Sequence, residues 1–521
     1  MSTETDSVPA LEPTGLPVTA FERRFGHPPG LVILFFAEMW ERFSYYGMRG
    51  LLKLYMVNYL FVTLRQTLQG ASYDRVGDPA SVLGWGFIQR LLPSLEPAAD
   101  PVVFQKCIDD ALPRLLAGNA STHMVPLASE AAHALAMQTC TVTPHASMLY
   151  GLYTGLVYAT PFFGGIIADR YLGQRKTVVV GGLLMAIGHF VMAFENQFFL
   201  ALLLLIIGNG AFKPNVSTQV GDLYKPGDPR RDGAFTIFYM GINLGSLLCN
   251  LVCGTLAVAY GWHYGFAAAG VGMCLGLTVY TLGGKYLAPD TFKRPTPGVV
   301  VEKEPLNKKE WTAVWALVIL CLLNVVFWAV YEQQGNTMQT WADEQTIWPR
   351  VLGHQIPSTW FQSFNPLCII LFAPLLDIFW RRQAKNGTEP SSVSKMAIGC
   401  FILGGSFIVM IIGAKLVGNG MGSMFWPLFC TFLVTIGELY LSPIGLSLVT
   451  KVSPVRIVSM MMGMWLASSF VGNILSGYIG IYYTRWSKDS FFLMLTVLGI
   501  VAGLSMWVFN KPLKKAIGSD I

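Results

Sequence analysis

The sequence predicts an all-α membrane protein whose chain crosses the bilayer about twelve times as two six-helix bundles. Of its 521 residues, 53% are hydrophobic and only 13% are charged, and the mean hydropathy is +0.49. This apolar content exceeds what the core of a soluble domain can use. Apolar runs of about 20 residues, enough helix to cross the hydrocarbon core, recur from Leu31 onward. A polytopic membrane protein is therefore indicated, built from helices rather than a barrel.

Apolar runs and polar breaks place the spans in order along the chain. They are expected near residues 31–60, 147–168, 177–195, 198–220, 233–260, 263–288, 311–334, 358–380, 394–415, 421–450, 456–483 and 489–510. The first bundle then covers residues 31–288 and the second covers 311–510, joined by a proline-containing, charged linker at 289–310. Residues 1–30 lack the apolar core and cleavage site of a secretory signal, and residues 511–521 form a short tail.

Positively charged residues indicate the orientation of these spans. Lys and Arg gather in the short segments that share a side with both termini, which predicts that both termini are cytoplasmic. The net charge of +6 is spread over many loops, so we expect no nucleic-acid partner. Similar loops follow the second and eighth spans, where Asp169 and Asp377 each precede basic residues. Two related halves of the chain would produce such similar loops. The loop at Asp377, however, is explained equally well by the ordinary excess of basic residues on the cytoplasmic side.

A long external loop is predicted between residues 62 and 146, whereas most of the other spans are joined by short loops. It is rich in Pro, Asp and Gly but contains helix-like pieces such as SEAAHALAMQ, which indicates a small cap or a partly ordered loop. Cys107 and Cys140 lie in this loop, whereas the other seven cysteines fall in apolar spans. A disulfide between the two is compatible with an oxidising compartment, but the sequence leaves the pairing open.

The first span carries charged residues, which are costly in hydrocarbon. At about 100° per residue, one helix face of roughly 140° holds a set of polar side chains: Glu38, Glu41, Arg42, Tyr45, Tyr46, Arg49 and Lys53. Lys53 is close to the external end, so we interpret it as a residue that extends its ammonium group to the interface. The others must line a wet cavity or pair within the bundle.

Three later spans carry further ionisable residues. Lys213 stands before Pro214 in the fourth span and needs a partner, for which the carboxylates of the first span are candidates. Glu332 follows Trp328 near the external end of the seventh span, either in the cavity or at its mouth. In the tenth span, Glu438 shares one face with Ser442.

The ionisable groups predicted to be buried comprise four acids and three bases: Glu38, Glu41, Arg42, Arg49, Lys213, Glu332 and Glu438. Protonation of one acid would neutralise this set, so the groups can exchange a proton for an ion pair, as coupling to a proton gradient requires. Acids and bases together also suit a zwitterionic substrate. Only His189 of the seven histidines falls inside a span, and no His–Cys or His–Glu metal spacing is found, which argues against an enzyme and against a cofactor.

The stretch EMWERFSYYG, from Glu38 to Gly47, resembles the Glu-x-x-Glu-Arg-Phe-x-Tyr-Tyr signature of the proton-dependent oligopeptide transporter family. This family is a branch of the major facilitator superfamily. The resemblance covers nearly the whole chain outside the external loop, through GGIIADRYLGQRKT, GNGAFKPNVSTQVGDLY, FYMGINLGSLL, FWAVYEQQGN, FQSFNPL and GELYLSPIGLSLVTKVSP. It implies the major facilitator fold, with a cavity between two halves, and symport of di- and tripeptides with protons by alternating access.

The same resemblance implies roles for individual residues. Glu38, Glu41 and Arg42 would form the proton-coupling motif, with Lys213 as the charge that pairs with it. Glu332 would take part in protonation and in an external salt bridge with Arg49. Arg49 and Lys213 would receive the peptide carboxylate, and Glu438 the amino terminus. Further substrate-binding positions, which match the family pocket or share the face of Glu438, are Tyr45, Tyr46, Tyr158, Asn243, Trp328, Asn365, Ser442 and Trp465.

We therefore expect an importer of di- and tripeptides that works as a monomer in a bacterial inner membrane, with protons as the coupling ion. One alternative is a relative that moves nitrate or another small solute, against which the acid at Glu438 argues. Another is a peptide receptor that does not transport. Many bacterial members of the family have two extra helices between the halves, and the linker here is too short and polar to hold them.

Overall fold

In the computed structural model the chain is almost entirely helical. The structure describes residues 20–61, 66–68, 71–73, 82–91, 101–117, 129–225, 228, 230–290, 306–351, 353–454 and 457–517. Residues 1–19, residues 291–305 of the predicted linker and residues 518–521 of the predicted tail lie outside this part.

The helices follow the chain order that the apolar runs predict. In the first half they are α1 (Ala20–Phe25), α2 (Pro29–Tyr55), α3 (Trp85–Leu91), α4 (Pro101–Ala117), α5 (Ser129–Ile167), α6 (Gln174–Val191), α7 (Phe198–Asp222), α8 (Arg230–Cys249), α9 (Thr255–Tyr260) and α10 (Trp262–Leu282). In the second half they are α11 (Lys308–Tyr331), α12 (Thr337–Glu344), α13 (Phe364–Lys385), α14 (Ser392–Val417), α15 (Phe425–Val452), α16 (Val458–Gly480), α17 (Tyr482–Arg485) and α18 (Lys488–Ile517).

Short π and 3-10 turns extend several of these helices, at Met56–Leu60, Ala168–Leu172, Glu195–Gln197, Asn250–Gly254, Gly283–Tyr286, Glu332–Gln334 and Ser358–Ser363. The strands are very short. They pair as β1 (Gln66–Leu68) with β2 (Ala71–Tyr73), β3 (Thr346–Ile347) with β6 (Gly422–Ser423), and β4 (Arg350–Val351) with β5 (His354–Gln355).

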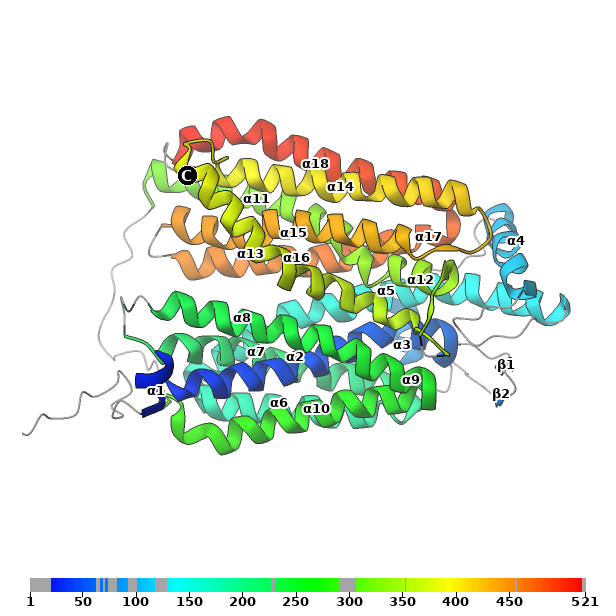
Figure 1. Ribbon diagram of the computed structural model, residues 1–521, viewed down its shortest axis with the longest axis horizontal. Helices are drawn as coiled ribbons and strands as arrows, with labels where there is room; N and C mark the ends of the chain where they lie inside the picture. The colour runs from blue at the N-terminus through cyan, green and yellow to red at the C-terminus, as the bar shows by residue number, and fades with distance from the viewer. Residues whose placement is uncertain are drawn as a thin grey trace, which may run out of the picture.

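The long helices form two bundles, one from each half of the chain (Figure 1). Helices α2, α5, α6, α7, α8 and α10 enclose one apolar core, which runs from Leu31 to Leu287. A second core, from Val314 to Met506, is built by α11, α14, α15, α16 and α18, and α13 packs against α15. This arrangement confirms the predicted all-α fold of two bundles.

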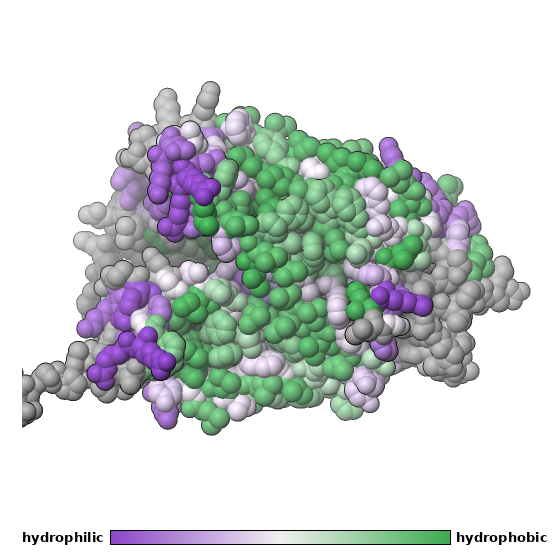
Figure 2. Space-filling model, viewed as in Figure 1, coloured by the Kyte–Doolittle hydropathy of each residue, from purple (hydrophilic) through white to green (hydrophobic). Residues whose placement is uncertain are grey.

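Among the described residues, 10 helices are long and apolar enough to cross a membrane. Helices α2 and α6 lie beside them in the first bundle (Figure 1) and complete the predicted spans. The charges of α2 and the polar start of α6, Gln174–Lys176, lower their apolar content. Figure 2 shows an apolar belt around the middle of the bundles, with hydrophilic residues at both ends, as expected for a surface that faces lipid.

Helix α5 begins at Ser129 rather than near residue 147, so the predicted external loop is shorter than expected. The segment SEAAHALAMQ consists of good helix formers and continues the span without a break. Helix α4 packs against this extension at one end of the molecule (Figure 1). A disulfide joins Cys107 of α4 to Cys140 of α5, with their Cα atoms 6.1 Å apart, which answers the question that the sequence left open.

At the opposite end, charged residues outside the membrane-spanning helices hold α1 against the start of α8. Arg230 donates hydrogen bonds to Glu22 (2.9 Å) and to the carbonyl of Gly26 (3.1 Å), and forms a 2.8 Å salt bridge with Asp228. The hydrogen bonds from Arg230 hold the pKa of Asp228 below its usual range. The charged form of Asp228 therefore supports this contact at neutral pH, and the support is lost as pH falls through the lowered pKa.

Contacts between the two bundles hold together the end of the molecule at which α3, α9 and α12 lie (Figure 1). The Asn58 amide donates to the Asp343 carboxylate (2.9 Å), and the Trp360 indole donates to the Thr255 hydroxyl (2.9 Å). Helices α5 and α16 approach closely in the same region, where a Cβ atom on Gly151 would lie 2.6 Å from the backbone of the facing helix. Small residues permit this approach between membrane helices.

The close approach of α5 to α16 predicts that Gly151→Ala destabilises the protein. The added methyl group meets backbone atoms that cannot rotate away, and overpacking of this kind costs about 1–3 kcal/mol. We expect the apparent Tm in detergent to fall by several degrees. Gly165→Ala on the same helix is the matched control, because a Cβ atom there meets nothing within 4 Å. An equal Tm for the two variants would contradict the close contact.

Candidate functional site

The acidic and basic residues of α2 form a buried ion-pair cluster inside the first bundle. Glu38, Glu41 and Arg42 are each 2% exposed or less. The Arg42 Nε group pairs with Glu41 Oε2 and lies 3.2 Å from Glu38 Oε1. These residues are neighbours on one helix face, because Arg42 follows Glu38 by four positions. Their burial confirms the prediction that they do not extend to the membrane surface.

Helix α7 contributes two more polar residues next to this cluster. The Asn209 Nδ2 group donates to Glu41 Oε1 at 2.8 Å. Lys213, one turn further along, lies over the Tyr158 ring, 4.9 Å from its centroid, and interacts electrostatically with Glu38 and Glu41.

The predicted ion pair between Lys213 and the carboxylates of α2 is not formed among the described residues. Arg42 takes this place, because it comes from the same helix as both acids and reaches them without tertiary movement. Lys213 remains a nearby charge instead of a direct partner.

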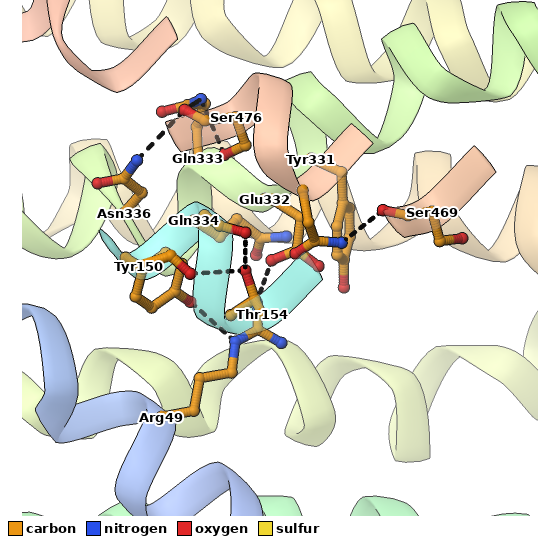
Figure 3. Close-up of polar contacts among 12 residues, drawn as sticks. Arg49, Tyr150, Thr154, Tyr331, Glu332, Gln333, Gln334, Asn336, Ser469 and Ser476 are labelled. Atoms are coloured by element: carbon orange, nitrogen blue, oxygen red, sulfur yellow. Dashed lines mark hydrogen bonds and ion pairs between the residues drawn. The ribbon is translucent and has the colours of Figure 1, made fainter. Parts of the chain in front are cut away.

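Arg49 joins the two bundles. Its guanidinium forms a salt bridge with Glu332, which follows the end of α11, and its Nε group donates to the Tyr150 hydroxyl at 2.8 Å. Figure 3 shows Arg49 reaching from α2 toward Tyr150 of α5 and Glu332. The Glu332 side chain is 1% exposed. The predicted salt bridge between Arg49 and Glu332 is therefore confirmed, and Glu332 lies inside the protein rather than at an open mouth.

Lys53 is buried, so its predicted position at the membrane interface is wrong. The residue is 1% exposed, and its ammonium group donates to the Thr143 carbonyl (3.0 Å) and the Ser147 hydroxyl (2.5 Å). Both acceptors belong to α5 near its long N-terminal extension, which covers this part of α2.

Glu438 on α15 is the acid of the second bundle. Its Oε2 atom accepts hydrogen bonds from the Tyr331 hydroxyl (2.8 Å) and from the Asn365 amide (3.1 Å). The same amide donates to Thr435 at 2.9 Å. Ser442 follows Glu438 by four positions and lies on the same face of the helix. Glu438 is only half-buried, so its carboxylate can meet a ligand as well as these partners.

Aromatic residues connect the charged groups of the two bundles. The Arg42 guanidinium lies over the rings of Tyr45 (5.2 Å to the centroid) and Tyr46 (5.8 Å), and that of Arg49 also lies 5.8 Å from the Tyr46 centroid. Tyr46 interacts electrostatically with both Arg49 and Glu438. Arg49 of the first bundle and Glu438 of the second bundle thus both lie in the surroundings of Tyr46.

The remaining predicted pocket residues differ in their surroundings. Trp328 is half-buried, and its indole nitrogen has no hydrogen-bond partner within the described chain. Trp465 is 3% exposed and Asn243 is 4% exposed. The Asn243 amide donates to the carbonyl of Tyr239, one turn earlier in α8.

Three residues of the site were missed by the sequence reasoning, namely Asn209, Tyr150 and Tyr331. Each is a polar residue in an apolar span, which is the signal that could have identified them. A further buried pair links Ser44 of α2 to His189 of α6 at 2.6 Å. No cluster of His, Cys, Asp or Glu that could hold a metal is present in the part of the chain searched.

These features define a class of protein: a two-bundle membrane transporter with buried charges between its helices. The POT family model matches residues 175–289 and 294–491. The chain therefore belongs to the POT family. It is an integral membrane protein, and its relatives are transporters rather than enzymes, as the sequence predicts.

Similar proteins include the peptide transporter YePEPT of Yersinia enterocolitica subsp. palearctica serotype O:3, which is 30% identical and covers 88% of each chain. The di-/tripeptide transporter of Lactococcus lactis subsp. cremoris is 28% identical, covering 95% of this chain and 97% of its own. A crystal structure of a POT peptide transporter variant in complex with alafosfalin has a TM-score of 0.74 and 29% identity, covering 95% of this chain and 96% of its own. This likeness confirms the predicted major facilitator fold.

The salt bridge predicts that substitutions of Arg49 and Glu332 are strongly coupled in their effects on the free energy of unfolding. Removal of one partner from a buried pair leaves an uncompensated charge and costs about 3–5 kcal/mol. In a double-mutant cycle with Arg49→Gln and Glu332→Gln, we expect a coupling in the free energy of unfolding above about 1 kcal/mol. Chemical denaturation in detergent measures it.

The exposed pair Arg381 and Asp377, whose side chains are 76% and 55% exposed, provides the control cycle. Its coupling is expected to stay below about 0.5 kcal/mol, as for surface helix pairs. Coupling energies of similar size in the two cycles would contradict the presence of a buried salt bridge between Arg49 and Glu332.

Proposed function

We propose that this chain is a proton-coupled symporter that imports di- and tripeptides by alternating access. The observation that carries the proposal is the placement of two opposite charges on different bundles: Arg49 lies over the Tyr46 ring in the first bundle, and Glu438 accepts from Tyr331 in the second. A peptide is a zwitterion, so it needs a cation for its carboxylate and an anion for its amino terminus. The names of the two relatives above, a peptide transporter and a di-/tripeptide transporter, support this choice of substrate.

The peptide carboxylate binds Arg49 and Lys213, and the amino terminus binds Glu438. Tyr331 and Asn365 position the Glu438 carboxylate through their hydrogen bonds. The walls around the peptide backbone and side chains are formed by Tyr45, Tyr46, Tyr158, Asn243, Trp328, Ser442 and Trp465. A peptide that spans the two charges draws the bundles together, because its ends lie on different bundles.

Protons act on two groups of acids. A proton on Glu332 removes the negative charge that holds Arg49, which weakens a contact between the bundles. A proton on Glu38 or Glu41 changes the partner of Arg42 within the first bundle. Lys213 adds a positive charge beside this cluster. At the Arg49–Glu332 pair and at the Arg42 cluster alike, an acid that holds a proton cannot form its ion pair. Proton movement is thereby linked to the arrangement of the helices.

Alternating access follows from the contacts between the bundles. In this proposal the end that the contacts between the bundles hold together faces outward, and the end with α1 and the last residues of α18 (Figure 1) faces the cytoplasm. We assign residues 31–288 and 311–510 to the two moving bundles and 289–310 to the cytoplasmic linker. The protein works as a monomer in a bacterial inner membrane, with protons as the coupling ion and no other cofactor.

Uptake of a labelled dipeptide into proteoliposomes tests the proposal. We expect an inward proton gradient to raise accumulation at least about tenfold over counterflow conditions, because the proton drives the cycle. Glu41→Gln should lose the gradient-driven uptake and retain counterflow exchange, since the amide cannot carry the proton. Accumulation by the wild-type protein that ignores the gradient would overturn symport.

Recognition of the amino terminus is tested separately with Glu438→Gln. The neutral amide keeps the shape of the side chain but loses the charge that faces the peptide ammonium, so we expect the KM for a free dipeptide to rise about tenfold or more. Uptake of an amino-blocked dipeptide is the matched measurement and should change little. If blocked and free peptides compete equally well for the wild-type protein, the role of Glu438 is wrong.

A further inference from the structure

We propose that Asn209 responds to the protonation state of Glu41 by rotating its side-chain amide, which makes it a positioning residue for proton coupling. The inference rests on the proposed function, because it gives Asn209 a part in the same proton site. Asn209 comes from α7, so it brings a second helix to the acid of α2. Neither residue has any exposed surface.

The present contacts suit an ionised Glu41. Its Oε2 atom pairs with Arg42, and its Oε1 atom accepts from the Asn209 Nδ2 group at 2.8 Å. A carboxylate is an acceptor only, and both of these partners are donors. Each oxygen therefore has a suitable partner when Glu41 carries no proton.

A protonated Glu41 needs a different partner. The acid now has one O–H group that must donate, and neither the Arg42 guanidinium nor an amide N–H₂ group can accept. The Asn209 Oδ1 atom is an acceptor, and it is buried without a hydrogen-bond partner among the described residues. A half-turn about the last side-chain torsion exchanges the amide nitrogen and oxygen at nearly the same positions. The same side chain can thus serve both states of Glu41 with no backbone movement.

Other groups around Glu41 do not offer this exchange. Arg42 and Lys213 are donors only, and the Glu38 carboxylate is paired with Arg42 at 3.2 Å. Tyr153 of α5 interacts electrostatically with Glu41, with no hydrogen bond to it in the described contacts.

Among the described residues, α6, α8 and α10 bring no charged side chain into contact with this acid. Helices α8 and α10 bring glycines against this stretch, Gly245 and Gly276. His189 of α6 bonds to Ser44 instead. Asn209 is therefore the neutral residue placed to accept a hydrogen bond from the O–H group of protonated Glu41.

The amide rotation has a consequence for Arg42. Once Glu41 is neutral, Glu38 is the carboxyl group that stays beside Arg42, at 3.2 Å, and the attraction shifts toward it when that group carries its charge. Asn209 stabilises the neutral acid while this shift takes place. Without the Asn209 amide, ionised Glu41 loses a hydrogen-bond donor and protonated Glu41 has no acceptor. Both protonation states of Glu41 then have a higher free energy inside the bundle.

The test measures dipeptide uptake by proteoliposomes between pH 5 and 8.5, with a proton gradient and in counterflow. Asn209→Leu removes both donor and acceptor, so gradient-driven uptake is expected to fall roughly tenfold, the effect of one buried polar group without a partner. Counterflow should stay within about threefold of wild type. Asn209→Asp adds a carboxylate that shares one proton with Glu41, so the pH of half-maximal uptake should rise by about one unit.

Asn215→Leu is the matched control. Asn215 lies on the same helix and is 3% exposed, but its amide donates to the backbone carbonyl of Ala211 at 2.7 Å and not to an acid. We expect this variant to lower thermal stability and to leave the pH profile unchanged.

The outcomes separate this inference from the proposed function. If the wild-type protein takes up dipeptide without using the gradient, the proposed function fails. If the wild type is gradient-driven but Asn209→Asp keeps the wild-type pH profile, the inference fails and the function stands. Equal loss of gradient-driven uptake and counterflow in Asn209→Leu and Asn215→Leu would show a structural role only.

Discussion

The burial of charge on α2 is the constraint on which the rest of the structure depends. A carboxylate or guanidinium inside a membrane protein is stable only when it is paired and hydrogen-bonded. Glu41 and Arg42 meet this requirement through their own pair and the Asn209 amide of α7. Glu38 is paired with Arg42 at 3.2 Å, and its carboxylate oxygens accept no hydrogen bond within the described structure. Helix α2 is therefore packed among α5, α7, α8 and α10 instead of facing lipid. The other helices of the first bundle surround α2, the helix whose charged side chains would be most costly to expose to lipid.

The Arg42 cluster and the Arg49–Glu332 pair connect different parts of the molecule, so a change of charge has a different structural effect at each. The Arg42 cluster lies within the first bundle, so a change in its charge alters contacts among helices that move together. The pair of Arg49 and Glu332 joins the two bundles, so the same change there alters how the bundles contact one another. Tyr46 lies between the two systems and interacts with both arginines. In the proposed function, a bound peptide that reaches Arg49 is thus close to both of the proposed proton sites.

Much of this architecture follows from the sequence, and the errors have physical causes. Apolar runs are a direct record of membrane burial, so the spans and the polar face of α2 were predictable. The position of Lys53 was wrong because the N-terminal extension of α5, whose helical sequence was recognised but not joined to the span, covers this part of α2. The partner of the α2 acids depends on distances between side chains, which periodicity does not give. The pairing of Cys107 with Cys140 likewise depends on how α4 folds back.

Helix α7 presents two different polar groups to the same cluster, and their spacing explains how both can act. Asn209 and Lys213 are four residues apart, so they lie on one helix face, with the neutral amide at Glu41 and the ammonium over Tyr158. Pro214 follows directly inside the helix and has no N–H group to donate to the preceding turn. The carbonyl of Gly210, four residues earlier, therefore lacks this backbone donor, and the turn between Asn209 and Lys213 has one helical hydrogen bond fewer. An amide that can serve both states of Glu41, and an ammonium near it on a turn with one helical hydrogen bond fewer, are what the proposed site needs if the proton is to be held while the surrounding charges rearrange.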